Sequence, residues 1–334
     1  MKLIVDDKIP FIKGEVEKVA DEVLYLPGAE INASDVHDAD ALIVRTRTLC
    51  NRTLLEGSRV QFIATATIGF DHLDTDYLSK AGISWSNCPG CNADSVAQYI
   101  HSVLLLLQNE RNLQLPHSTL GIIGVGHVGS RVLRVAQSLG MKVLCCDAPR
   151  TDQGEQGFIG FDEIVEKCDV ISFHVPLIRE GRYRTIHMAD EKFFERLARV
   201  PYIINTSRGE VVDNEALLGA LNKGRVADAV IDVWENEPDI NTALLERVFL
   251  GTPHIAGYSA DGKANATRMS LEALCLHFGI DNVRFDIQPP ALPDHIDKSN
   301  PLNLYNPQRD SRALKQHPEQ FEYLRGNYPL RREK

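Results

Sequence analysis

The sequence lacks several features that mark whole classes of protein. Its longest apolar run, Val103 to Leu107, is far too short to span a bilayer. The first residues, MKLIVDDKIP, contain no apolar core with a small-residue cleavage site, so we expect a cytosolic protein. Positive charge is scarce too, because 36 Lys and Arg face 46 Asp and Glu, a net charge of −10. This net negative charge argues against sequence-independent binding to nucleic acid and against binding to an anionic membrane.

Cysteines are few, and their number, seven, is odd, which is typical of a reduced compartment rather than of a disulfide framework. Cys145 and Cys146 lie in an apolar run, so we expect them in the core. Cys88 and Cys91 form a CxxC motif, the pattern of a redox pair or of half a zinc site. No second CxxC completes four ligands, and the Pro-Gly between the two cysteines is an equally good turn signal. We therefore assign no metal ligands.

What remains is the composition of an ordinary globular protein, 43% hydrophobic and 25% charged, in 334 residues, which corresponds to about two domains. Short β-rich runs alternate with helical stretches. We expect strands at 3–5, 41–46, 62–67 and 83–86, a helix at 94–109, six strands at 120–125, 142–147, 169–175, 202–206, 229–233 and 248–250, and a helix at 259–278. This alternation predicts an α/β fold with doubly wound parallel sheets.

A glycine-rich turn lies between the first strand of the second series and the helix that follows it. The residues GIIGVGHVG contain the motif G-x-G-x-x-G. Its glycines allow a tight turn, a close approach of backbone to pyrophosphate, and close packing of helix on strand, while the helix N-terminus offers N–H groups to phosphates. The predicted cofactor contacts in this turn are Gly124, Gly126, His127, Val128 and Gly129.

An acidic residue follows at the spacing that a dinucleotide site needs. Asp147 ends the next expected strand, 23 residues after Gly124. A carboxylate there would accept hydrogen bonds from the adenosine ribose and repel a 2′-phosphate, which favours NAD over NADP. A lone glycine motif is weak evidence, and a plain packing turn is the alternative. Strand, glycines, helix and acid in this order nevertheless favour NAD binding.

Three polar residues follow three successive strands of the second series. Arg208 lies in INTSRGEVVD, Glu237 in DVWENEP and His254 in TPHIAGYS. A guanidinium matches a carboxylate in two hydrogen bonds, a histidine exchanges a proton near neutral pH, and a nearby glutamate favours its protonated form. Each residue alone is more often structural. Their joint occurrence in successive loops predicts oxidation of a hydroxyl beside a carboxylate.

These segments, GIIGVGHVG, INTSRGEVVD, DVWENEP and TPHIAGYS, in this order and spacing, resemble the D-isomer-specific 2-hydroxyacid dehydrogenases over about residues 1 to 280. The resemblance implies two Rossmann-like or flavodoxin-like domains, one of them split along the chain. Residues 1–93 and 258–284 would form the substrate-binding domain, 94–257 the NAD-binding domain, and 285–334 a C-terminal dimerisation arm that belongs to neither core.

The resemblance also implies roles for individual residues. Arg208 would bind the substrate carboxylate, Glu237 would support the histidine, and His254 would be the acid and base. Substrate contacts are implied at Thr46, Thr67, Arg208 and Tyr258. NAD contacts beyond the glycine turn are implied at Asp147, Thr206, Ser207, Arg208, Asp232 and Gly257. Val175 stands where relatives can carry a hydroxyl that touches the cofactor, so it is not included.

The residues alone say less about the substrate. Thr65 and Thr67 could receive anionic oxygens, although threonine in a strand is usually only a β-former. Arg45 and Arg47 could draw in a phosphate, with a surface salt bridge as an equal alternative. We expect a phosphorylated 2-hydroxy acid as substrate and a homodimer. A 3-phosphoglycerate or glyoxylate/hydroxypyruvate dehydrogenase and an NAD-sensing corepressor-like protein remain alternatives.

Overall fold

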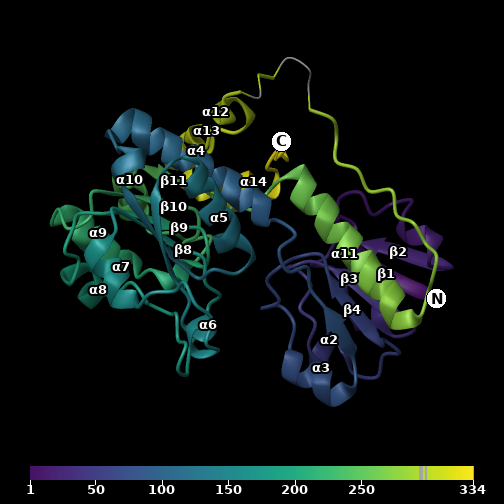
Figure 1. The fold of residues 1–334 in the computed structure, drawn as a ribbon. Coiled ribbons are helices and arrows are strands. Elements are labelled where there is room, and N and C mark those ends of the chain that lie inside the picture. The colour runs from purple at the N-terminus through teal and green to yellow at the C-terminus, as the bar shows by residue number, and fades with distance from the viewer. Residues whose placement is uncertain (293–295, 298, 334) are drawn as a thin grey trace. The chain divides into compact units, whose positions relative to one another are not determined.

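The computed structural model describes residues 1–292, 296–297 and 299–333 (Figure 1). In these residues the chain forms two compact units, which we call unit 1 and unit 2. Unit 1 comprises residues 1–92, 259–292 and 333, and unit 2 comprises residues 93–258, 296–297 and 299–332. The predicted arm at 285–334 includes residues 293–295, 298 and 334, which lie outside the described residues. None of the helices in the described ranges is long and apolar enough to cross a membrane.

Unit 1 is built on a parallel sheet. Its strands are β1 (Lys2–Asp6), β2 (Glu22–Leu26), β3 (Ala41–Val44), β4 (Phe62–Thr65) and β5 (Ser84–Ser86). Their order in the sheet is β2-β1-β3-β4-β5. Its helices are η1 (Val16–Lys18), α1 (Ala33–Val36), α2 (Arg52–Leu55), α3 (Thr75–Ala81) and α11 (Ala260–Phe278). The sequence analysis missed β2. Its sequence EVLYL does contain a short apolar run, but as an edge strand it is exposed or half-buried along its whole length.

The expected helix at 259–278 is confirmed as α11, which packs against β4 in unit 1. It begins where the Ser259 hydroxyl oxygen accepts a hydrogen bond from the Gly262 N–H at 2.8 Å, a typical N-cap. It ends at Gly279, whose φ of 64° is the left-handed conformation that glycine adopts at little cost. Near that end the His277 ring stacks on Phe62 with ring centroids 4.7 Å apart.

All seven cysteines are free thiols. Cys88 and Cys91 flank a turn, as the Pro-Gly between them predicted, and both are buried in unit 1. Burial raises the pKa of the Cys88 thiol to about 11 and that of Cys91 to about 12. Both thiols are therefore protonated at neutral pH, which disfavours the thiolate that redox chemistry or zinc binding needs. Cys146 is buried as expected, whereas Cys145 is half-buried.

Unit 2 is built on a second parallel sheet, and each of its six strands overlaps a predicted one, although β11 shares only Leu250 with the expected strand at 248–250. They are β6 (Thr119–Ile123), β7 (Lys142–Cys146), β8 (Val170–Phe173), β9 (Tyr202–Asn205), β10 (Asp228–Ile231) and β11 (Leu250–Gly251). Their order is β11-β10-β9-β8-β6-β7. Chain progression reverses between β6 and β8, and ligands of such sheets bind beyond the carboxyl ends of the strands at this switch point.

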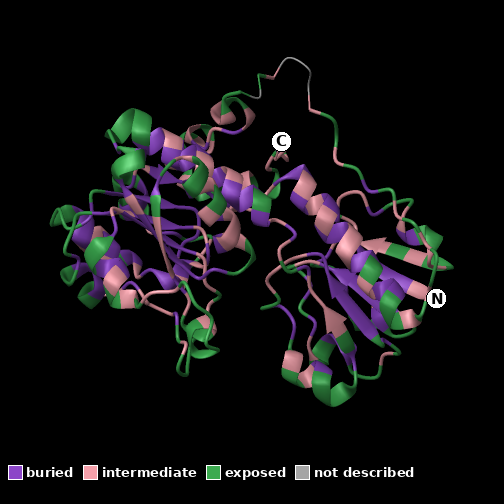
Figure 2. Ribbon diagram, in the orientation of Figure 1, coloured by how far each residue is buried: buried purple, intermediate pink, exposed green. Residues whose placement is uncertain are grey.

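Helices cover both faces of this sheet, so that its inner strands β6, β8 and β9 are buried on both sides (Figure 2). Ile203 belongs to one apolar cluster and its neighbour Ile204 to the other, as alternation along a strand requires. The helices are α4 (Ala93–Arg111), η2 (Leu115–His117), α5 (His127–Ser138), α6 (Ala148–Asp152), α7 (Phe161–Lys167), α8 (Glu191–Glu195), η3 (Gly209–Val211), α9 (Asn214–Asn222), α10 (Thr242–Arg247), α12 (Pro301–Leu304), α13 (Gln308–Gln316), η4 (Pro318–Gln320) and α14 (Phe321–Gly326).

The last described segment, residues 299–332, corrects one expectation. We call it the C-terminal arm, and it packs into unit 2 rather than standing outside both cores. Its α12 contacts α4 and its α13 contacts β11. Leu314 and Phe321 join an apolar cluster of that unit, at 0% and 1% exposure. Two apolar anchors of this kind are worth several kcal/mol of burial, which explains why a polar, charged segment is held in place.

Candidate active site

The glycine turn follows β6 and leads into α5. Gly124 has a φ of +87°, and a Cβ there would lie 2.5 Å from the carbonyl oxygen of His174. A Cβ on Gly129 would lie 2.1 Å from the carbonyl oxygen of Gly124, so helix and strand approach too closely for a side chain. A Cβ on Gly126 would meet nothing within 4 Å. The turn therefore fits a pyrophosphate, because it leaves open space beside bare backbone at the start of a helix.

Asp147 follows β7 and touches the glycine turn. Its Oδ2 accepts a hydrogen bond from the Val125 N–H at 2.8 Å, and its Oδ1 accepts one from the Arg150 N–H at 3.2 Å. Arg150 in turn donates from Nη1 to the Val125 carbonyl oxygen at 2.7 Å. A carboxylate offers about four acceptor positions. Asp147 therefore fixes the turn and keeps acceptor capacity for ribose hydroxyls, although its contact with the cofactor stays a prediction.

Thr206, Ser207 and Arg208 form the turn after β9. Asn205 builds this turn, because its Oδ1 accepts from the Ser207 N–H at 3.1 Å and its Nδ2 donates to the Arg208 carbonyl oxygen at 2.9 Å. The Thr206 hydroxyl oxygen is buried and makes no hydrogen bond within the described part of the chain. An orphaned buried hydroxyl calls for a partner. A bound dinucleotide would supply one, so these residues also fit the cofactor.

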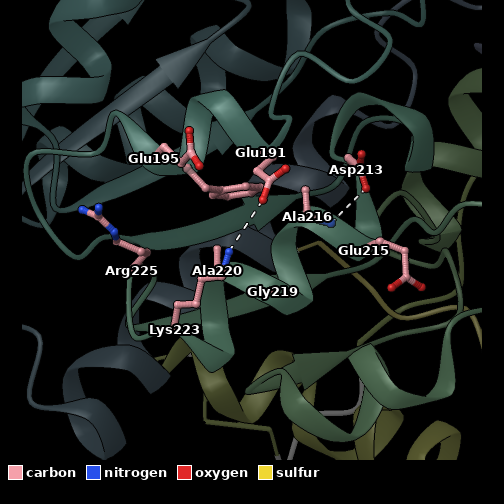
Figure 3. Close-up of a pocket in the computed structure, with 10 residues that line it drawn as sticks. Glu191, Glu195, Asp213, Glu215, Ala216, Gly219, Ala220, Lys223 and Arg225 are labelled. Carbon is pink, nitrogen blue, oxygen red and sulfur yellow. Dashed lines mark hydrogen bonds and ion pairs between the residues drawn. The ribbon is translucent and has the colours of Figure 1, made fainter.

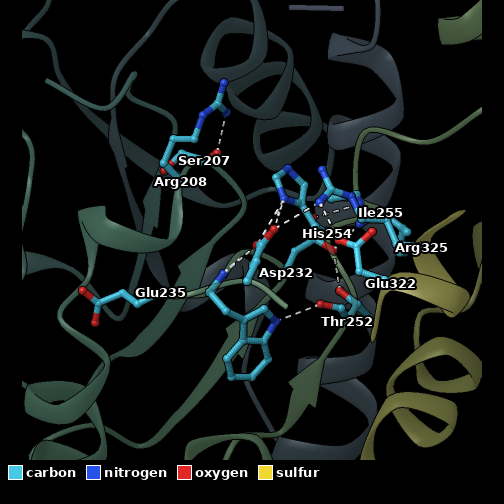
Figure 4. A network of polar contacts seen from close by, with 12 residues as sticks. Ser207, Arg208, Asp232, Glu235, Thr252, His254, Ile255, Glu322 and Arg325 are labelled. Carbon is cyan, nitrogen blue, oxygen red and sulfur yellow. Dashed lines mark hydrogen bonds and ion pairs between the residues drawn. The ribbon is translucent and has the colours of Figure 1, made fainter. Parts of the chain in front are cut away.

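Arg208 stands at the start of η3 and is half-buried. Its Nη1 donates to the Ser207 carbonyl oxygen at 2.8 Å, which fixes one arm of the guanidinium (Figure 4). A guanidinium carries five N–H donors. Most of the Arg208 fork therefore stays available for a substrate carboxylate.

The imidazole of His254 lies against the carboxylate of Glu237. The His254 Nδ1 lies 2.8 Å from Glu237 Oε2 and 3.1 Å from Oε1, and the Trp234 N–H donates to Oε1 at 3.0 Å. Burial opposes ionisation of Glu237, but His254, the Trp234 N–H and the nearby Arg325 outweigh it and lower the pKa of the Glu237 carboxyl. An ionised carboxylate only accepts, so the proton on His254 lies on Nδ1 in this contact. Proton exchange at Nε2 stays a prediction.

Asp232 at the end of β10 holds the loop that carries His254. Its Oδ1 accepts from the Thr252 hydroxyl at 2.6 Å and from the Ile255 N–H at 2.8 Å, and its Oδ2 accepts from the Ala256 N–H at 2.9 Å. Asp232 is only 1% exposed. The structure thus gives Asp232 a positioning role, while a direct contact with NAD stays a prediction.

The backbone of His254 has a φ of 57°, a conformation that costs a residue with a Cβ about 1–3 kcal/mol. Two hydrogen bonds from its N–H, to the carbonyl oxygens of Asp232 at 2.8 Å and Thr252 at 3.0 Å, hold it there. The Thr252 hydroxyl also contacts the Tyr99 hydroxyl at 2.8 Å, and its carbonyl oxygen accepts from the Trp234 indole N–H at 3.0 Å. A buried polar network therefore aims the imidazole.

The structure brings most of the predicted residues together in unit 2 and leaves two in unit 1. Gly257 and Tyr258 directly follow the His254 loop. In unit 1, Thr46 is exposed in the turn after β3. Thr67 follows β4, and its hydroxyl contacts the Thr65 hydroxyl at 2.7 Å and donates to the Gly69 carbonyl oxygen at 2.8 Å. Arg45 makes an ion pair, with its Nε 3.2 Å from Oδ2 of buried Asp6.

Sequence reasoning missed residues that support this site. Trp234 lies in the motif DVWENEP and Thr252 in TPHIAGYS, but the sequence analysis assigned roles only to other residues of these two motifs. Arg325 and Arg331 lie in the C-terminal arm, in a charged stretch whose composition is typical of a solvent-exposed segment. Arg331 is 9% exposed and Arg325 contacts Glu237 at 3.3 Å. Nothing in their local sequence signals burial, because Glu237 and the Ile255 carbonyl group, which they contact, lie 88 and 76 residues earlier in the chain.

A hollow of about 390 Å³ lies on another part of unit 2, between α8 and α9 (Figure 3). Glu191, Asp213 and Glu215 line it, with Lys223 3.6 Å from Glu191. The Asp213 carboxylate there caps α9 by accepting from the Ala216 N–H at 3.0 Å. None of its lining residues was predicted for the site, so we assign it no part in the chemistry.

This chain is similar to one known family and to curated proteins that share one name. Residues 105–256 match the model of the family "D-isomer specific 2-hydroxyacid dehydrogenase, NAD binding domain". The erythronate-4-phosphate dehydrogenase of Bacteroides thetaiotaomicron is 58% identical over 339 residues, which span 100% of this chain and 97% of that protein. The enzyme of the same name from Citrobacter koseri is 42% identical over 350 residues, which span 100% of this chain and 92% of that protein.

Two solved structures of dehydrogenases have a similar fold. The D-lactate dehydrogenase from Aquifex aeolicus, complexed with NAD and lactic acid, superposes with a TM-score of 0.69 at 27% identity, covering 84% of this chain and 96% of that one. The NAD⁺-bound 3-phosphoglycerate dehydrogenase of Entamoeba histolytica superposes with a TM-score of 0.70 at 27% identity, covering 86% of this chain and 98% of that one.

Proposed function

Because this chain belongs to the D-isomer specific 2-hydroxyacid dehydrogenase family of NAD-dependent enzymes, we propose that it oxidises 4-phospho-D-erythronate to 2-oxo-3-hydroxy-4-phosphobutanoate, a step of pyridoxal 5′-phosphate biosynthesis. Relatives with 42% and 58% identity, aligned over the whole chain, carry the name of that enzyme. The observation that supports the chemistry is the His254–Glu237 pair at 2.8 Å.

The chain's own residues supply the acid–base part of the reaction. His254 Nε2 takes the proton of the C2 hydroxyl. Glu237, which accepts from Nδ1, stabilises the imidazolium that forms, as a carboxylate does for other catalytic histidines. NAD, when bound, supplies the acceptor for the hydride that leaves C2. The C2–H and O–H bonds thus break as the C2=O bond forms, and His254 then passes its proton to solvent.

Arg208 orients the substrate in this proposal. Its fork binds the carboxylate next to C2 and fixes the direction in which C2–H points. Thr46, Thr67 and Tyr258 contact the rest of the substrate. The chain has a net charge of −10, so it attracts a phosphorylated acid only where positive charge is concentrated locally. For substrate binding, a cation such as Arg208 therefore matters more than the net charge of the chain.

The cofactor site in this proposal is the glycine turn with Asp147 and the turn after β9. Val128 and His127 present the N-terminus of α5 to the pyrophosphate, and Asp147 accepts from the adenosine ribose. Gly257 and Asp232 border the nicotinamide end. The remaining assignments are that 1–93 with 258–284 binds substrate, that 94–257 binds NAD, and that the enzyme is a cytosolic homodimer with 285–334 contributing to dimerisation.

A substrate panel tests the proposal. NADH formation is followed with 4-phospho-D-erythronate, D-erythronate, 3-phospho-D-glycerate and D-glycerate. We expect kcat/KM to be highest for 4-phospho-D-erythronate, and loss of its phosphate to lower that value at least tenfold. A higher kcat/KM for 3-phospho-D-glycerate would assign the chain to that activity instead. NAD binding without turnover of any acid would favour a sensing protein.

A further inference from the structure

The C-terminal arm brings a cation to the catalytic pair. Arg325 of α14 places Nη1 3.3 Å from Glu237 Oε2, the same oxygen that lies 2.8 Å from His254 Nδ1. Its Nε also donates to the Tyr258 hydroxyl oxygen at 3.4 Å. Figure 4 shows Arg325 beside His254. One carboxylate oxygen is therefore shared between the imidazole and a guanidinium from the far end of the chain.

This contact differs from an ordinary surface ion pair. The side chains are 24% exposed for Arg325, 16% for Glu237 and 28% for His254. Charges with so little solvent around them are screened weakly, so each one changes the protonation of its neighbours. The negative charge of Glu237 attracts the proton on His254 Nδ1, and a cation that shares the same carboxylate oxygen weakens that attraction.

The other charged groups around His254 are already engaged. The Asp232 carboxylate is taken up by two N–H groups and the Thr252 hydroxyl. Glu322, also on α14, lies 3.8 Å from Arg325 Nη1. Arg331 donates to the carbonyl oxygens of residues 255 and 256. Arg325 is thus the arm group that contacts Glu237, and Tyr258 and Glu322 contact Arg325 in turn.

We propose that Arg325 is a positioning residue that sets the protonation of His254 through Glu237, so that the C-terminal arm is part of the catalytic machinery. Without the guanidinium, the full negative charge of Glu237 acts on the imidazole, and His254 holds its proton up to a higher pH. His254 then becomes a base over a narrower pH range in the direction of hydroxyl oxidation. The inference rests on the proposed role of His254 as the acid and base.

The test measures His254 itself and needs no substrate. The imidazole is titrated by NMR in the full-length protein labelled at histidine, with the His254 signal assigned by its loss in His254→Ala. In Arg325→Gln we expect the midpoint to rise by about half to one pH unit, a three- to tenfold change in proton affinity. Arg325→Lys, which keeps the charge, restores most of the original midpoint. Arg312→Gln, which removes an exposed arginine of the same arm, leaves it unchanged.

A kinetic measurement accompanies the titration. The acidic limb of the pH profile of kcat/KM moves upward with the NMR midpoint in Arg325→Gln, and not in Arg312→Gln. Arg325→Met, which keeps the apolar stem, replaces the Gln variant if that one does not fold. An unchanged midpoint in a folded, charge-free variant overturns the inference. So does a raised KM for substrate with no shift of midpoint, because Arg325 would then bind the substrate directly. Inactivity of the wild type toward 4-phospho-D-erythronate rejects the proposed substrate and leaves the NMR result standing.

Discussion

Arg331 donates a hydrogen bond from Nη2 to the carbonyl oxygen of Ala256 at 2.6 Å, which ties the end of the chain to the loop that carries His254. Its Nη1 also donates to the Ile255 carbonyl oxygen at 3.0 Å. Its guanidinium lies 3.9 Å from the ring centroid of Tyr305. Asp232 holds the N–H groups of the same two loop residues. The segment after His254 is therefore fixed through both its donors and its acceptors.

Replacing Arg331 with Met should destabilise the protein by about 2–4 kcal/mol, because buried carbonyl oxygens lose their charged donor. The Met side chain keeps most of the volume, so the loss reports hydrogen bonds rather than a cavity. Urea unfolding followed by circular dichroism measures it. Arg312→Met on the exposed side of the arm is the control, with an expected change below about 0.5 kcal/mol. Equal stability of the two variants would show that Arg331 does not hold the loop.

Much of the fold was predictable because the inner strands of both sheets are buried apolar runs. Ile203 and Ile204, which face opposite layers, are typical of strands covered on both sides. The edge strand β2 was missed because one side of it stays open to solvent. Strand ends were also placed too late, since Arg45 and Thr46 already belong to the turn after β3.

The positions of Arg208, Glu237 and His254 were predictable for a related reason. Parallel strands end at one edge of the sheet, so polar residues after β9, β10 and β11 must gather there. Arg325 and Arg331 obey no such rule. Their burial depends on Glu237 and on the loop carbonyl groups, which are far away in the chain. A charged terminal stretch has the same composition whether it is solvated or packed against the protein.

Asp147 holds the glycine turn and is proposed to bind the adenosine ribose, and substitutions can separate these two roles. Asp147→Ala should raise the KM for NAD and relax discrimination against NADP by about tenfold or more, because the charge that repels a 2′-phosphate is lost. Asp147→Asn keeps an acceptor for the Val125 N–H and should lose selectivity while preserving more of the affinity for NAD. Initial rates with both cofactors measure this. Asp152→Ala, at the end of α6, is the control for a nearby acid. Unaltered cofactor selectivity in Asp147→Ala would reject the ribose contact.

Glu237 should make stability depend on pH. Its pKa lies below its ordinary value of 4.5, since His254, Trp234 and Arg325 outweigh the effect of burial. A lowered pKa means that Glu237 contributes stability above pH about 4.5 and loses it as the pH falls through the folded-state value. Loss of the charged acceptor for His254 and the Trp234 N–H should make Glu237→Gln less stable than the wild type by about 1–3 kcal/mol at pH 7, the usual worth of hydrogen bonds to a charged group. The difference should shrink towards pH 3. Urea unfolding at both pH values measures it, and a difference independent of pH would contradict the expected ionisation.

Substitution of Arg208 tests whether its guanidinium binds the substrate or the cofactor. In Arg208→Lys the charge remains, but a lysine ammonium cannot form the two parallel hydrogen bonds that a guanidinium makes with a carboxylate. We expect kcat/KM for the acid to fall about 10²-fold, with a KM for NAD within about threefold of the wild type, because the carboxylate contact orients C2 for hydride loss. Steady-state kinetics with each substrate varied in turn provide the values. His254→Ala offers the complementary pattern, since loss of the acid–base group should lower kcat by about 10²- to 10⁴-fold and leave binding of the acid largely intact. If Arg208→Lys instead lowered only the affinity for NAD, the guanidinium would belong to the cofactor site and the carboxylate would need another partner.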